Sequence, residues 1–227
     1  MTSRFFDPSL VARTYRDPLA WLSLGTDLVP IIAIILFQWG PTPLVALYWL
    51  ENLVIGGYTI LRLAGSAVTG LGNLLLALFM IPFFTLHYGM FCYGHGIFIK
   101  SFSGAGGGDG YMDVVNWALG SGEGMAWFVA VIAASNMVFY LIDFIGKGEL
   151  RRTNPAAEMF APYGRIVTLH VAIILGAFLS IATQQPLLGV LVLILIRVVF
   201  GIVLSVLRRM RLEGQLGKLA DTFAQAL

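Results

Sequence analysis

Six ionisable side chains in the long apolar segments of this chain are the first candidates for chemistry, because charged groups are rare there. They are Asp27, Glu51, His87, Asp143, His170 and Arg197, and Asn136 is a neutral polar companion. An ionisable group at membrane depth is energetically costly, so each one is by default a candidate for function. Carboxylates, imidazoles and a guanidinium can together bind a metal ion, pass protons or form buried ion pairs.

Metal binding is the first chemistry that these residue types predict. Imidazole and carboxylate groups are ligands of zinc, iron and manganese, so we expect a divalent metal. The predicted metal ligands are Glu51, His87, His170 and His95. The polar groups expected to support catalysis, by orienting a ligand or neutralising an oxyanion, are Asp27, Arg197 and Asn136. The candidate ligands come from separate segments without an HExxH pattern, so the prediction rests on the set as a whole.

Two other interpretations of the same residues stay open. His87 and His170 have the residue type and similar depth of axial haem ligands, which would make the chain a b-type haem electron-transfer protein. Alternatively, Arg197 pairs with Asp27 or Glu51 in a network that fixes helix packing, or that serves a transporter or a proton or ion pathway. In the metal interpretation, an enzyme would activate water or oxygen against a lipophilic substrate that arrives through the bilayer.

The composition places the chain in a lipid bilayer. Hydrophobic residues make up 58% of its 227 residues and charged residues only 11%, far from the values of soluble domains. The apolar content also excludes disorder, and a net charge of +2 provides no basic face for nucleic acid. Cys92 is the single cysteine, so no disulfide forms within the chain.

The apolar runs predict one all-α transmembrane domain over residues 1–227, a bundle of about six membrane-spanning helices. The expected spans cover residues 19–39, 43–64, 71–99, 125–146, 162–183 and 186–208. Residues 100–124 form an outer loop in which 111–119 favour a short helix, and 209–227 form an amphipathic cytoplasmic tail. Counting about 1.5 Å per residue places the polar residues of the six spans within one or two helical turns of a common plane.

Basic residues set the expected orientation. Lys and Arg residues gather before the first span, between the fourth and fifth, and after the sixth, so both termini are predicted to be cytoplasmic. We expect a multi-pass protein of the bacterial or archaeal inner membrane, in contact with lipid. Self-association into a homo-oligomer stays open.

Two segments carry a resemblance to a known family. Tyr48-Trp49-x-Glu51-Asn52 and Phe84-x-x-His87-Tyr88-Gly89, the latter followed by His95-Gly96, resemble an uncharacterised family of bacterial and archaeal multi-pass membrane proteins, a domain of unknown function. The resemblance implies a membrane fold over most of the chain and a functional unit of Glu51, His87 and His95. It supplies no reaction.

Overall fold

The computed structural model describes residues 8–151, 155–160, 162–164, 166–167, 171 and 186–212, and this part of the chain contains helices and no strand. The elements are α1 Pro8–Thr14, α2 Pro18–Phe37, α3 Pro41–Ala67, α4 Leu71–Phe102, α5 Tyr111–Gly120, α6 Met125–Phe139, a π-helix Tyr140–Gly146, a 3-10 turn Glu149–Arg151, α7 Pro155–Phe160 and α9 Pro186–Leu212. The fold is therefore all-helical, as the sequence predicts.

Helix starts follow local sequence. Proline is the first residue of α2, α3 and α9, where its missing N–H costs no helical hydrogen bond. Asp17 caps α2, because its carboxylate accepts a hydrogen bond of 3.0 Å from the backbone N–H of Leu19. Local signals thus fix where the long helices begin.

Four helices are long and apolar enough to cross a membrane: α2, α3, α4, and α6 together with the π-helix, which span Met125–Gly146. They coincide with the first four predicted spans, with α3 and α4 each extending about one turn further. The sixth predicted span lies within α9, a helix of 27 residues. The fifth, 162–183, lies mostly outside the described residues, as does the tail beyond residue 212. The short helix predicted at 111–119 is confirmed by α5.

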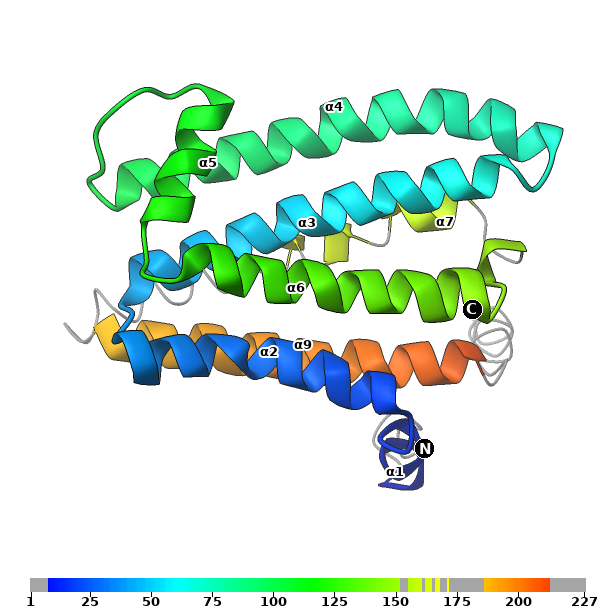
Figure 1. The fold of residues 1–227 in the computed structure, drawn as a ribbon, viewed down its shortest axis with the longest axis horizontal. Coiled ribbons are helices and arrows are strands. Elements are labelled where there is room, and N and C mark those ends of the chain that lie inside the picture. The colour runs from blue at the N-terminus through cyan, green and yellow to red at the C-terminus, as the bar shows by residue number, and fades with distance from the viewer. Residues whose placement is uncertain are drawn as a thin grey trace, which may run out of the picture.

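The long helices lie side by side in a bundle (Figure 1). α4 lies along one side against α3, α6 follows, and α2 and α9 run together on the opposite side. α3 is the central helix, since 61% of its most apolar window is buried, against 17% for α4. α5 crosses the bundle at the end of α4 (Figure 1). This arrangement lets α3 contact helices on several of its faces.

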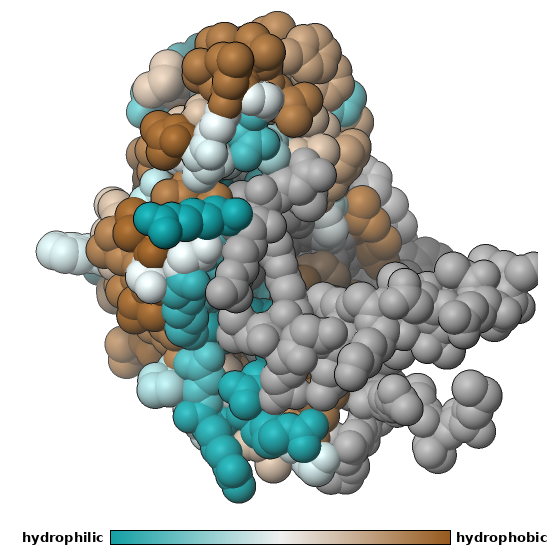
Figure 2. Space-filling view, turned by 90° about the vertical axis from the view of Figure 1, so that its right-hand side faces the viewer, coloured by the Kyte–Doolittle hydropathy of each residue, from teal (hydrophilic) through white to brown (hydrophobic). Residues whose placement is uncertain are grey.

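Both the N-terminal helix α1 and the C-terminal end of α9 lie at the same end of the bundle (Figure 1). Leu10 of α1 packs there against Val206 and Met210 of α9. Figure 2 views this end and shows hydrophilic side chains gathered over its lower part, with apolar side chains above them. We call it the terminal end of the bundle below.

Candidate functional site

The centre of the bundle holds three charged side chains from three helices, which we call the triad: Asp27 of α2, Glu51 of α3 and Arg197 of α9. Arg197 donates from both Nη atoms to Glu51, with Nη2 lying 2.8 Å from Oε1 and Nη1 bonded to Oε2. Its Nη2 also lies 3.3 Å from Oδ1 of Asp27. Asp27 and Glu51 are only 4% and 3% exposed, so the triad is an interior ion cluster.

Tyr48 completes the surroundings of Arg197. The guanidinium carbon lies 4.5 Å from the centre of the Tyr48 ring, in the range of a cation–π contact. The Tyr48 hydroxyl and the Arg197 Nε are buried and have no hydrogen-bond partner among the described residues. Two polar atoms beside the triad are thus available to water or a ligand, since buried polar groups usually have partners.

Gly201 allows α2 and α9 to approach closely at the triad. A Cβ atom on Gly201 would overlap the carboxylate of Asp27. The side chain of Asp27 therefore lies directly against the backbone of α9, one helical turn from Arg197 along that helix. Glycine at this position is a requirement of the site's geometry.

The segment Tyr48-Trp49-x-Glu51-Asn52 has a structural role for each named residue. Tyr48 and Glu51 contact Arg197 on one side of α3. On the side of α4, the Trp49 indole N–H donates to the Cys92 carbonyl at 2.7 Å, and the Asn52 carbonyl accepts from the Tyr88 hydroxyl at 3.0 Å. The segment fixes α3 to α4 and presents Glu51 to α9.

The triad by itself carries one negative charge, because two carboxylates share one guanidinium. A net charge in a low-dielectric interior is costly unless further groups compensate it. The arrangement therefore favours a further positive charge nearby, from another residue, a proton or a cation.

The other predicted site residues have different surroundings. His87 is half-buried among the rings of Phe83, Phe91 and Tyr163, whose centres lie 5.4, 5.1 and 6.0 Å from its own. His95 Nδ1 lies 2.7 Å from the Phe91 carbonyl of its own helix. The Asn136 amide likewise donates to the Ile132 carbonyl, at 2.8 Å.

The structure thus joins three of the predicted residues and separates others from them. Asp27, Glu51 and Arg197 come together, whereas Asn136 bonds within α6, and His170 lies outside the described residues. The described part of the chain contains no group of three His, Cys, Asp or Glu side chains able to hold a metal ion. The ligand set of Glu51, His87, His95 and His170 stays a prediction.

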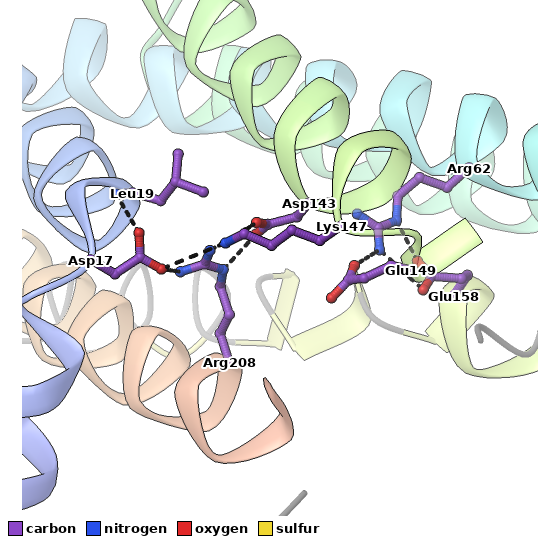
Figure 3. Close-up of polar contacts among 8 residues, drawn as sticks. All are labelled: Asp17, Leu19, Arg62, Asp143, Lys147, Glu149, Glu158 and Arg208. Carbon is purple, nitrogen blue, oxygen red and sulfur yellow. Dashed lines mark hydrogen bonds and ion pairs between the residues drawn. The ribbon is translucent and has the colours of Figure 1, made fainter. Parts of the chain in front are cut away.

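A second ion network lies at the terminal end and joins α2, α9 and the π-helix (Figure 3). Arg208 donates to both oxygens of Asp143, at 2.6 and 2.9 Å, and to Asp17 at 2.9 Å. Lys147 lies 2.9 Å from Asp143. Burial raises the pKa of Asp17, but the hydrogen bond from Leu19 and the nearby Arg208 more than offset this, so its pKa is lowered below the ordinary value and the group is held ionised.

A third network links α3 to the segment that follows the π-helix (Figure 3). Arg62 donates to Glu158 of α7 at 2.5 Å and to Glu149 at 2.9 Å. Its guanidinium also lies 4.5 Å from the centre of the Phe144 ring. Sequence reasoning missed these partners, although a single arginine near the end of the predicted span 43–64 was a signal that carboxylates lie nearby.

Comparison with known proteins defines the family and leaves the activity open. Neither the curated proteins nor the solved structures contain a match to this chain. One family model matches residues 9–216, and its description is "Family of unknown function (DUF6498)". Because the match covers most of the sequence, from α1 to beyond the end of α9, the chain belongs to the DUF6498 family of unknown function.

Proposed function

We propose that the protein is a multi-pass membrane protein that conducts protons, with the triad as the central proton-binding site. The observation that carries the proposal is the sharing of one buried guanidinium by two carboxylates. Chains of acidic and polar residues inside membrane bundles serve as proton relays in pumps and transporters. The transporter or ion-pathway alternative from the sequence is therefore the one that this geometry favours.

The proton is expected to reside on Asp27. Glu51 accepts two hydrogen bonds from Arg197, and such bidentate pairs are the stronger kind. Asp27 has the longer contact with Arg197, 3.3 Å, so protonating it costs less attraction to that guanidinium than protonating Glu51 would. When Asp27 loses its proton, it competes with Glu51 for Arg197. The triad then has two arrangements that differ by one proton.

A polar seam between α2 and α9 leads from the triad toward the terminal end. Arg197, Gly201, Ser205 and Arg208 recur at helical spacing on one face of α9, and Gly201 and Ser205 are buried. Arg197 and Arg208 are eleven residues, or about 16 Å, apart. Arg197 pairs with Asp27 of α2, and Arg208 pairs with Asp17, the N-cap of the same helix. The seam thus has ion pairs at both levels and small residues between them, and it is the route that we propose for proton transfer.

We place the terminal end of the bundle on the cytoplasmic side. The proposal also keeps the six membrane-spanning helices that the sequence predicts. Arg13, Arg16, Lys147, Arg208 and Arg209 all belong to segments at this end, and the positive-inside rule assigns such an end to the cytoplasm. In this orientation the seam opens to the cytoplasm through the network of Asp17, Asp143 and Arg208. Both termini are then cytoplasmic.

Metal-dependent catalysis on a lipophilic substrate and haem-based electron transfer stay as proposals of lower rank. Both depend on His170, which lies outside the described residues. Elemental analysis of the purified protein tests the metal proposal, and a Soret band in its absorption spectrum tests the haem proposal.

Proton conduction is tested with the protein reconstituted in vesicles that carry a potassium-set membrane potential and an internal pH dye. Wild-type vesicles are expected to acidify or alkalinise with the sign of the potential, well above protein-free vesicles. Asp27→Asn keeps the shape of the side chain and removes the titrating group, so we expect at least a tenfold slower flux. Glu123→Gln, the same change on an exposed side chain, is the control and keeps the wild-type rate.

Two outcomes would refute proton conduction. Wild-type vesicles with the proton flux of protein-free vesicles at every potential show that no pathway exists. A flux that is unchanged in Asp27→Asn shows that protons pass elsewhere.

A further inference from the structure

An open groove of about 670 Å³ runs between α3 and α4 and has α5 at one end. Glycines form part of its walls, Gly56 and Gly57 on α3 and Gly89 on α4. The aromatic ring of Tyr111, the first residue of α5, lines the end of the groove. The rest of the lining is almost wholly apolar, and the groove lies on helices long and apolar enough to span the membrane.

The polar groups inside the groove walls are already bonded to the protein. The Thr85 hydroxyl donates at 2.7 Å to a carbonyl one turn earlier on α4. Tyr88 donates to the carbonyl of Asn52, and Tyr93 to the carbonyl of Asp109 at 2.5 Å. An occupant of this part of the groove therefore needs no hydrogen-bonding groups along its length, which is the property of a hydrocarbon chain.

The size of the groove selects among apolar occupants. Ten residues of α-helix, about 15 Å long and about 10 Å across, occupy on the order of 1,200 Å³. The groove holds about half of that volume, within the range of sites for one small apolar ligand. A flexible chain one methylene wide fits inside a groove of this volume, whereas a transmembrane helix of a second copy could place only one of its faces there.

Tyr111 indicates which end of a bound lipid lies next to α5. Its side chain is 42% exposed, and its hydroxyl has no hydrogen bond to another described residue. Tyrosines with an apolar ring and a free polar tip are enriched where membrane meets water. At this end Lys100 also donates to the carbonyl of Gly108 and lies 3.3 Å from Asp109, so the surroundings are polar. A polar headgroup is favoured at the α5 end and a hydrocarbon chain along the groove.

We propose that the groove between α3 and α4 binds one acyl chain of a membrane phospholipid, with the headgroup beside Tyr111. This lipid site is separate from the triad. α3 presents Glu51 to α9, whereas Leu53 and Gly57 of the same helix line the groove. The experiments that test the lipid site are therefore independent of those that test proton conduction.

The glycines of the groove provide a test that leaves the packing intact. A Cβ atom at Gly57 or Gly89 would meet no atom within 4 Å, so both positions have open space at which leucine can extend into the groove. Gly94 of α4 is equally open but does not line the groove, so Gly94→Leu is the matched control. By contrast, a Cβ at Gly56 would lie 2.7 Å from the Tyr88 ring, and that position is left unchanged.

The probe is phosphatidylcholine with a photoactivated diazirine in one acyl chain, present as a small fraction of phosphatidylcholine–phosphatidylglycerol vesicles that contain the full chain. After illumination, labelled peptides are located by mass spectrometry. We expect wild-type labelling concentrated on residues 53–60 and 85–93. It should fall at least fivefold in the Gly57→Leu/Gly89→Leu variant and stay unchanged in Gly94→Leu. Proton flux measured on the same vesicles should not change.

Three results would overturn the lipid site. Labelling spread evenly over exposed apolar residues of α4 such as Phe79 and Phe98 would show ordinary bilayer contact. Labelling that persists in the Gly57→Leu/Gly89→Leu variant would show that the acyl chain does not bind in the groove. Cross-links between two copies of the chain through residues 85–93 would assign the surface to self-association.

Discussion

Replacing Arg197 by glutamine is expected to lower the free energy of unfolding by about 3–5 kcal/mol, because removing one partner of a buried ion pair leaves the other charge inside the bundle. The Glu51 carboxylate would lose both hydrogen bonds from Arg197, and Asp27 its contact with the same guanidinium. Unfolding in increasing dodecyl sulfate, followed by circular dichroism of the purified protein, measures the change.

Variants that change the charge of the triad in other ways serve as controls for Arg197→Gln. Glu51→Gln leaves one carboxylate and one guanidinium, so its loss of stability should be clearly smaller than that of Arg197→Gln. Adding Glu51→Gln to Arg197→Gln removes the carboxylate that Arg197 pairs with most closely, and should restore part of the stability. Arg16→Gln removes an exposed arginine and should change stability by under about 0.5 kcal/mol. Equal effects of Arg197→Gln and Arg16→Gln would contradict an interior cluster.

Replacing Gly201 by leucine is expected to have the second largest effect. The new side chain would occupy the position of the Asp27 carboxylate, so α2 and α9 must separate or Asp27 must leave Arg197. Overpacking of this kind costs about 1–3 kcal/mol. We expect that loss in the same unfolding measurement, together with a proton flux as low as that of Asp27→Asn.

Gly25 of α2 provides the comparison for Gly201. It lies near the triad in sequence, but a Cβ there meets no atom within 4 Å, so Gly25→Leu should leave stability and flux close to wild type. If Gly201→Leu behaves like Gly25→Leu, α2 and α9 are not in close contact at Asp27, and the geometry of the triad is wrong.

The helices were predictable because their signals are local. Apolar runs of about 20 residues and prolines at the first helical position give α2, α3 and α9 within a few residues. Counting residues along each helix also put Asp27, Glu51 and Arg197 at a common level, and the contacts among these three residues agree with this. The sequence also offered the pairing of Arg197 with Asp27 or Glu51 as one interpretation, and the structure joins Arg197 to both.

Rotation of each helix about its axis was not predictable. Asn136 shares the predicted depth of Asp27 but bonds to its own helix, because the faces that meet are decided by packing between helices. The partners of Arg62 were missed for a similar reason. Glu149 and Glu158 lie 87 and 96 residues away in sequence and reach Arg62 only through the turns after the π-helix. Such contacts leave no periodic pattern in the chain.

The most direct test of the central claim is infrared spectroscopy of the protonated carboxyl group. The C=O stretch of a carboxylic acid is separated from the bands of ionised carboxylates, so one buried protonated side chain can be detected. We predict that wild-type protein at neutral pH shows this band, that Asp27→Asn abolishes it and that Glu123→Gln retains it. Absence of the band in wild type, or its persistence in Asp27→Asn, would contradict a proton bound at the triad.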